Sequence, residues 1–125
     1  MQTCYLAVDI GASSGRHIIG HMENGKMVLE EIYRFENGMV KKDGELCWEF
    51  DRLFQEIKNG LKKCKEIGKI PVSMGVDTWG VDFVLLDKDD KVLGNTVGYR
   101  DHRTEGMDED CLLYTSPSPR DRTRS

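Results

Sequence analysis

The stretch Ala7-Val8-Asp9-Ile10-Gly11-Ala12-Ser13-Ser14-Gly15-Arg16 decides the fold of this chain. The apolar run from Cys4 to Val8 predicts a strand that is covered on both faces. After Asp9 the chain turns through Gly, Ala and Ser, whose small side chains let backbone amides and hydroxyls approach a phosphate. Arg16 adds a cation suited to phosphate oxygens, and Asp9 adds a carboxylate that can hold a divalent metal through water.

This turn matches neither of the two common phosphate-binding loops. A P-loop requires Gly-Lys-Ser/Thr at the start of a helix, and no Lys follows Gly15. The spacing of Gly11 and Gly15 does not fit Gly-x-Gly-x-x-Gly either. Residues 17–22 are short and rich in β-branched side chains, and Asn24-Gly25 after them is a strong hairpin signal. The turn therefore joins strand to strand, and the residues alone leave open an ordinary Gly/Ser hairpin.

Charge, cysteine spacing and hydropathy exclude several classes of protein. The net charge is −4, and an acidic domain without a basic patch argues against nucleic acid as the main partner. Cys4, Cys47 and Cys64 lack CxxC spacing, which indicates a reducing compartment and not a disulfide framework or a zinc site. The sequence has no basic segment followed by a signal-peptide core and no apolar run of membrane-spanning length. We expect a soluble, cytoplasmic protein.

The C-terminal segment is not expected to belong to the domain. Residues Cys111 to Asp121 resemble the translation of a sequencing-library adapter, and Arg122 to Ser125 continue in the same style. A natural Ser/Pro/Arg tail would also be disordered, because such residues cannot bury enough apolar area to offset their ordering entropy. We therefore predict one domain over residues 1–110, interrupted before its natural end, and a non-native disordered tail over residues 111–125.

Apolar periodicity predicts one long helix and several strands. Leu53, Phe54, Ile57, Leu61, Cys64 and Ile67 form the apolar stripe of a helix, with Asp51 as its N-cap and Gly68 as its left-handed end. A strand is predicted over Lys26 to Phe35, with its apolar residues on one parity that only Glu31 interrupts. A polar loop is predicted over Glu36 to Gly44, followed by an extended piece over Leu46 to Phe50. Further strands are predicted over Ile70 to Val76 and Phe83 to Leu86, and Val92 and Leu93 would form the strand that pairs with the latter.

A second group of polar side chains, Asp77-Thr-Trp-Gly-Val-Asp82, directly follows a predicted strand. Ligands of open α/β sheets bind outside the carboxyl ends of the strands. Gly80 would let a polyol reach the backbone, Trp79 could face the apolar side of a sugar, and Asp82 could accept hydroxyl hydrogen bonds. A turn in which the Asp side chains only cap backbone amides explains the same residues.

Together the two motifs resemble the rhamnulokinase branch of the FGGY family of carbohydrate kinases. The resemblance covers residues 3–106 and includes Arg34-Phe-Glu-Asn-Gly38, Trp48, and Tyr99-Arg-Asp-His-Arg103. The wider family usually has Gly-Thr-Thr after the Asp of its phosphate turn and Trp in place of Tyr99. The Gly-Ala-Ser and Tyr of this chain point to the rhamnulokinase branch.

The resemblance implies a ribonuclease-H-like α/β half domain of the actin, Hsp70 and sugar kinase superfamily. Its mixed sheet would have the strand order 3-2-1-4, with the first strand and the strand over Ile70 to Val76 as parallel neighbours. Parallel strands end at the same edge of a sheet, so Asp9 and Asp77 should emerge side by side. The phosphate turn and the turn at Gly80 would then flank one cleft.

The resemblance also implies the reaction, which transfers phosphate from ATP to the 1-hydroxyl of L-rhamnulose. Asp9 would help to hold Mg²⁺ through water. The ATP phosphates would be bound by Ala12, Ser13, Ser14, Gly15 and Arg16, and the sugar by Gly80, with Trp79, Asp82, Arg100 and Asp101 as weaker candidates. No catalytic residue is assigned, because the family's general base lies in the second half of the full chain, whose C-terminal domain would be the partner of this one. The alternatives are another FGGY sugar kinase, such as a fuculokinase, and a non-enzymatic actin-like or Hsp70-like ATP-binding protein.

Overall fold

The central strand of the fold, β1 (Cys4–Ile10), pairs with a strand on each side. A computed structural model describes residues 2–101 and shows a four-stranded sheet in the order β3-β2-β1-β6. β2 (Ser14–Glu23) is antiparallel to β1 and to β3 (Lys26–Glu36), whereas β6 (Met74–Asp77) is parallel to β1. The predicted order 3-2-1-4 is therefore confirmed, although the fourth strand is shorter than the predicted Ile70 to Val76.

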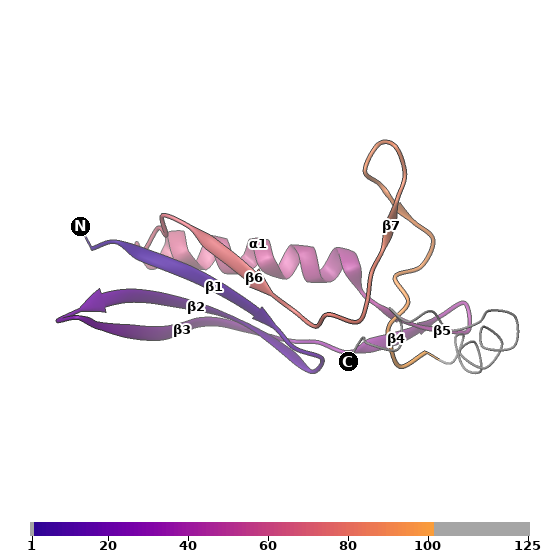
Figure 1. Cartoon of the computed structure of the whole chain (residues 1–125), viewed down its shortest axis with the longest axis horizontal. Helices are drawn as coiled ribbons and strands as arrows, with labels where there is room; N and C mark the ends of the chain where they lie inside the picture. Colours follow the sequence, from indigo (N-terminus) through magenta and orange to yellow (C-terminus); the bar gives the residue numbers. More distant parts are fainter. Residues whose placement is uncertain (1, 102–125) are drawn as a thin grey trace, which may run out of the picture.

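One helix, α1 (Phe50–Glu66), lies along one face of this sheet (Figure 1). Leu53, Ile57 and Cys64 of its predicted apolar stripe pack in the core, whereas the other three residues of the stripe are exposed. Gly68 follows the helix with φ of 72°, the left-handed conformation expected there. The prediction of Asp51 as the N-cap is wrong. The N-cap is Glu49, which makes no side-chain capping bond, and the helix begins one residue before Asp51.

The core lies between α1 and the sheet, and only one face of β1 contributes to it. Cys4, Leu6, Val8 and Ile10 are buried against the helix side, whereas Tyr5, Ala7 and Asp9 are exposed. The prediction that this strand is covered on both faces is therefore wrong for the described residues. Cys64 belongs to the same core, and burial raises the pKa of its thiol, as expected for a small packing residue.

The interrupted alternation in β3 has a structural cause. The register of β2 and β3 shifts between His17 and Ile18, so that His17 pairs with Tyr33 while Ile18 pairs with Glu31. Ile32 is the extra residue of this β-bulge, and a bulge reverses which side chains point to a given face. Met27 and Leu29 therefore lie on the side to which a Cβ at Gly20 would point, 3.0 and 3.2 Å from it, while Phe35 packs in the core on the other.

Two short hairpins lie outside the main sheet. The predicted polar loop over Glu36 to Gly44 is wrong, because β4 (Met39–Lys42) pairs there with β5 (Glu45–Trp48). Asp43 and Gly44 both have positive φ, which suits the tight turn between these strands. The strand predicted over Phe83 to Leu86 is shorter, since β7 (Leu85–Leu86) pairs with β8 (Val92–Leu93). Phe50 begins α1 and does not extend β5.

Residues 96–98 run along the free edge of β5. The amide of Trp48 donates to Thr96 O and the amide of Gly98 donates to Leu46 O, each over 2.8 Å. Cys47 and Val97 form the antiparallel bridge between these two bonds. This pairing brings the predicted Tyr99-Arg-Asp segment next to Trp48, which lies 51 positions before Tyr99 in the sequence.

His17 fixes the helix to the sheet. Its side chain is fully buried, its Nε2 lies 3.2 Å from Ile57 O in α1, and its Nδ1 has no hydrogen-bond partner in the described part of the chain. Because a carbonyl only accepts, Nε2 carries the proton of the neutral ring. Burial lowers the pKa of His17, an effect that the Ile57 carbonyl and the charge of Glu56 partly oppose.

We therefore expect the folded chain to lose stability as the pH falls below 6.5, the ordinary pKa of histidine. In that range the unfolded chain binds a proton at His17 that the folded chain does not. The free energy of unfolding then falls by at most about 1.4 kcal/mol per pH unit until the pH reaches the lowered pKa. Urea unfolding between about pH 5 and 8 should show this slope, and His17→Gln should remove it. The control His21→Gln keeps His17 and should keep the slope; an equal slope for His17→Gln and wild type would contradict the assignment.

Within residues 2–101, the helix is too short and too polar to cross a membrane. The predicted domain end near residue 110 and the predicted non-native tail lie outside the described residues and stay predictions.

Candidate functional site

The predicted phosphate turn joins β1 to β2 at the carboxyl end of β1. Gly11 N–H donates to Ser14 O over 2.9 Å and closes a tight hairpin turn. Ala12 and Ser14 are half-buried and Ser13 is exposed, so the tip of the turn is open to solvent. Gly15 is instead buried on the helix side, where a Cβ would lie 2.1 Å from Cζ of Phe35.

Asn37 anchors this turn, a role that the sequence motifs did not reveal. Its amide N–H donates to Ser13 O over 2.9 Å and its Nδ2 donates to Gly11 O over 2.8 Å. A trans peptide directs its C=O and its N–H to opposite sides. The two bonds therefore orient the amides of Ala12 and Ser14 away from Asn37 and hold two peptide planes of the turn. The Asn-Gly pair after β3 was the available signal, since Asn side chains commonly bond to turn backbone.

Two arginines and two aspartates form a row across the outer face of the sheet. Asp9 pairs in register with Arg16 on one side and with Asp77 on the other, and Arg16 pairs with Arg34. Side chains of paired residues share a face. This face is opposite to α1, because the buried residues of β1 alternate with Asp9. The prediction that Asp9 and Asp77 emerge side by side from parallel strands is confirmed.

Within this row the charged groups are only loosely paired. Arg16 Nε lies 3.9 Å from Asp9 Oδ2, too far for a hydrogen bond, and this buried nitrogen has no hydrogen-bond partner among the described residues. The Asp9 side chain is 51% exposed. Arg34 is engaged differently, since its Nε and Nη2 donate to Glu31 Oε1 over 3.0 and 2.7 Å. Asp9 and Arg16 thus lie beside the turn, and no hydrogen bond joins their side chains at this distance.

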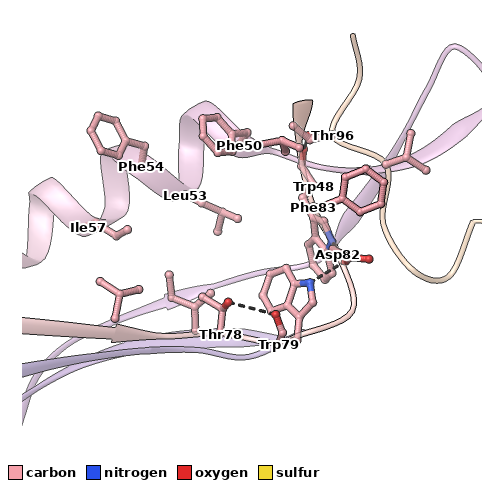
Figure 2. Close-up of a pocket in the computed structure, with 14 residues that line it drawn as sticks. Trp48, Phe50, Leu53, Phe54, Ile57, Thr78, Trp79, Asp82, Phe83 and Thr96 are labelled. Atoms are coloured by element: carbon pink, nitrogen blue, oxygen red, sulfur yellow. Dashed lines mark hydrogen bonds between the residues drawn. The ribbon is translucent and has the colours of Figure 1, made fainter. Parts of the chain in front are cut away.

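The Gly80 turn follows β6 at the same edge of the sheet as the phosphate turn. Gly80 is exposed, and a Cβ added there would contact nothing within 4 Å. Its backbone is therefore accessible, as a polyol contact would require. Trp79 and Asp82 are both half-buried, and Figure 2 shows Asp82 beside the indole rings of Trp48 and Trp79.

The carboxylate of Asp82 accepts a hydrogen bond from each of these two indoles. Trp48 Nε1 and Trp79 Nε1 both lie 2.6 Å from Asp82 Oδ2. The centroids of the two indole rings are 4.2 Å apart, with a tilt of 37° between the planes. Trp48 is buried and packs in the fold, while its N–H reaches a residue 34 positions later.

An apolar cavity of about 310 Å³ separates this turn from α1 (Figure 2). The helix contributes Phe50, Leu53, Phe54 and Ile57, and Trp79 and Phe83 line the other side. A sugar has hydroxyls that must keep hydrogen-bond partners when they are buried. The apolar cavity does not supply enough of them, so the exposed backbone at Gly80 fits a sugar better than the cavity does.

Arg100 and Asp101 follow the segment that pairs with β5, and Asp101 lines a pocket together with Val81 and Asp82 of the Gly80 turn. Asp101 Oδ1 accepts the amide of Leu46 over 2.9 Å. The guanidinium carbon of Arg100 lies 5.5 Å from the ring centroid of Tyr99, whose own ring is 6.3 Å from that of Trp48. Asp101 thus helps to hold residues 96–98 on β5, and Arg100 is exposed.

Comparison with known proteins gives the chain a family. The family model described as FGGY family of carbohydrate kinases, N-terminal domain, matches residues 4–112. The chain is 61% identical over 107 residues to the rhamnulokinase of Halalkalibacterium halodurans and 54% identical over 116 residues to that of Oceanobacillus iheyensis. These matches cover 86% and 93% of this chain but only 23% and 25% of the relatives, so the chain spans about a quarter of their length.

Solved structures agree on the fold. A gluconate kinase from Lactobacillus acidophilus superposes with a TM-score of 0.73 over 90% of this chain and 23% of its own, at 15% identity. A xylulose kinase from the same organism gives a TM-score of 0.70 over 89% of this chain and 22% of its own, also at 15% identity. The predicted α/β, ribonuclease-H-like sugar kinase fold is therefore confirmed. The chain belongs to the FGGY family of carbohydrate kinases, and residues 4–112 match the N-terminal domain of that family.

Proposed function

We propose that the chain is the N-terminal part of an ATP-dependent kinase that phosphorylates L-rhamnulose. The oxygen of the sugar 1-hydroxyl forms a bond to the γ-phosphorus of ATP, the bond between that phosphorus and the β,γ-bridging oxygen breaks, and the products are L-rhamnulose 1-phosphate and ADP. The hydroxyl proton passes to a general base, which the rest of the enzyme would supply. The sequence identity to two rhamnulokinases supports the choice of sugar.

The parallel pairing of Asp9 with Asp77 is the observation that carries this proposal. It brings the ends of β1 and β6 to the same edge, and with them the phosphate turn and the Gly80 turn. Phosphoryl transfer depends mainly on positioning of the reactants and on stabilisation of charge. A nucleotide phosphate at one turn and a sugar hydroxyl at the other would lie close enough for transfer.

At the phosphate turn, Ala12, Ser13, Ser14, Gly15 and Arg16 would bind the ATP phosphates, through backbone amides, hydroxyls and the guanidinium. Arg16 Nε has no hydrogen-bond partner among the described residues, so it is available to donate to a phosphate oxygen. Asp9 would hold Mg²⁺ through water, and the bound ion would neutralise charge on the phosphates. This fits the exposed carboxylate, since Mg²⁺ usually keeps several waters and takes one or two protein carboxylates. Residues 2–101 contain no group of three or more metal-binding side chains, so phosphate oxygens and water would complete the shell.

The reaction would take place in the cytoplasm. The use of ATP and the three free, buried thiols of Cys4, Cys47 and Cys64 agree with this location. The main alternative is a different FGGY sugar kinase, such as a fuculokinase. A non-enzymatic actin-like or Hsp70-like protein is disfavoured by the match to a carbohydrate kinase family. The choice of sugar is therefore the point to test.

A chimeric enzyme tests this function directly. Residues 4–101 would replace the aligned segment of the 61%-identical rhamnulokinase, and coupled ADP release would be measured with L-rhamnulose, L-fuculose and D-xylulose. We expect kcat/KM for L-rhamnulose to exceed that for the other sugars at least about tenfold, the effect of roughly 1.4 kcal/mol in transition-state binding. The 125-residue chain alone is the control and should show no sugar-dependent turnover. A preference for another sugar, or equal turnover without sugar, would reject the proposal.

Two variants of the chimera separate the proposed nucleotide and sugar sites. Arg16→Ala should raise the KM for ATP about tenfold or more, because it removes a charged partner of the phosphates. Gly80→Leu places a bulky side chain where nothing now lies within 4 Å, so it should mainly raise the sugar KM. Steady-state kinetics with each substrate varied in turn measures both effects. The reverse pattern would show that the two sites are assigned wrongly.

A further inference from the structure

The Gly80 turn contains a contact in which two indoles bond to one carboxylate. Trp48 ends β5 and Trp79 follows β6, so the two donors come from separate elements of the fold. Their N–H groups meet at the single oxygen Oδ2 of Asp82. An indole N–H can only donate, and a partly buried one needs an acceptor.

This contact closes a loop around the proposed sugar contact. Trp79 and Asp82 are three residues apart, so their side-chain bond spans Gly80 and Val81. Within residues 78–82, the other side-chain hydrogen bond runs from Thr78 Oγ1 to Trp79 O over 3.3 Å. Gly80 has no Cβ of its own to restrict its backbone. The position of its peptide groups therefore depends on the bond between Asp82 and Trp79.

The second indole ties the closed loop to the rest of the fold. Trp48 is 7% exposed, so most of its indole packs in the fold. Its amide donates to Thr96 O over 2.8 Å, and the hydroxyl of Thr96 donates back to Trp48 O. Asp82 is thereby connected through Trp48 to β5 and to residues 96–98, which are independent of β6.

We infer that Asp82 is a positioning residue of the sugar site, which acts through Trp48 and Trp79 to hold Gly80 in place and does not bind the sugar itself. This differs from the direct hydroxyl contact that the motif alone predicts for Asp82. The inference rests on the proposed sugar kinase function, since Gly80 is taken as the sugar contact. Its physical basis is that hydrogen bonds to a carboxylate are stronger and shorter than neutral ones, and two of them converge here.

The first test is spectroscopic and does not depend on activity. Two indoles 4.2 Å apart and fixed by one carboxylate should give a strong near-ultraviolet circular dichroism signal in the 125-residue chain. Asp82→Ala should remove most of this signal, and Asp82→Asn should retain part of it because an amide oxygen still accepts. Asp89→Ala is the matched control, an exposed aspartate in the turn between β7 and β8 whose loss should leave the signal unchanged.

The second test is kinetic and uses the chimera. Asp82→Ala should raise the sugar KM about tenfold, as expected when a hydrogen bond to a charged group is lost, while the KM for ATP stays within about twofold. Trp48→Phe keeps an aromatic ring and removes only the indole N–H that bonds to Asp82, so it should raise the sugar KM as well. The effects of Asp82→Ala and Trp48→Phe should not add in the double variant, because both break the same contact.

The results separate this inference from the proposed function. Activity of the unmodified chimera on L-rhamnulose tests the function alone, and the ratios between variants and that chimera test the role of Asp82. Additive effects of Asp82→Ala and Trp48→Phe, or an unchanged sugar KM in Trp48→Phe, would mean that Asp82 contacts the sugar directly. A near-ultraviolet signal that survives Asp82→Ala would also overturn the inference.

Discussion

Replacing Gly60 by Ala should destabilise the chain by about 2–3 kcal/mol, although the same change usually stabilises a helix by about 0.5–1 kcal/mol. Gly60 is buried in the middle of α1 against the ring of His17. A Cβ at this position would lie 2.0 Å from His17 Nε2 and 2.1 Å from Cδ2. The ring cannot move away freely, because it is fully buried and bonded to Ile57 O. Thermal unfolding should show a loss of about 10–20 °C.

A double variant identifies the cause of this loss. His17→Ala removes the ring that the new methyl group would meet, so Gly60→Ala should cost much less in that background. The double variant should be at least about 1 kcal/mol more stable than the sum of the single changes. Gly75→Ala in β6 is the control, since a Cβ there meets nothing within 4 Å, and it should change stability by less than about 0.5 kcal/mol. An increase in stability on Gly60→Ala would show that α1 does not pack on His17 as described.

The sheet order was predicted from the family resemblance, and local features of the sequence agree with it. The strand that ends at Asp9, the hairpin signal at Asn24-Gly25 and the long amphipathic helix leave few ways to pair the strands. A helix between two strands forms a crossover and makes them parallel. The side-by-side placement of Asp9 and Asp77 follows from that topology without knowledge of any side-chain contact.

Burial of β1 was predicted wrongly because an apolar run does not say what covers it. Tyr5 and Ala7 are compatible with a buried face, but α1 covers only the face of Leu6 and Val8. The bulge at Ile32 appeared in the sequence only as the interruption at Glu31, which does not by itself indicate an extra residue in the strand. The hairpin of β4 and β5 had a signal in Asp43-Gly44, which the polar residues on either side obscured.

At the site, the sequence motifs predicted the two turns but not the residues that hold them. Asn37 reaches Gly11 across 26 positions, and Trp48 reaches Asp82 across 34. Such contacts depend on which strands become neighbours, so a local pattern cannot contain them. The same limit applies to Gly15, which the motif presents as a phosphate-binding glycine and the structure places under Phe35.

Gly15→Ala should therefore destabilise the fold, by about 2–3 kcal/mol, before it affects any ligand. A Cβ at Gly15 would lie 2.1 Å from Cζ of Phe35 and 2.6 and 2.7 Å from Cε1 and Cε2. Phe35 is 5% exposed and packed in the core, so its ring has no space to leave. Urea unfolding of the 125-residue chain measures the loss. Gly38→Ala is the control, because it lies close to the same turn and a Cβ there meets nothing within 4 Å.

The variant Phe35→Leu separates a packing role of Gly15 from a role in phosphate binding. Leucine lacks the Cζ and Cε atoms that would clash, so Gly15→Ala should cost less than about 1 kcal/mol in this background. In the chimera, the double variant should then have the same KM for ATP as Phe35→Leu alone, because the turn backbone recovers its position. If the double variant is stable but its KM for ATP is still raised, the added methyl group obstructs the phosphates themselves. In that case a side chain at Gly15 would be excluded both by the approach of the ligand and by packing under Phe35.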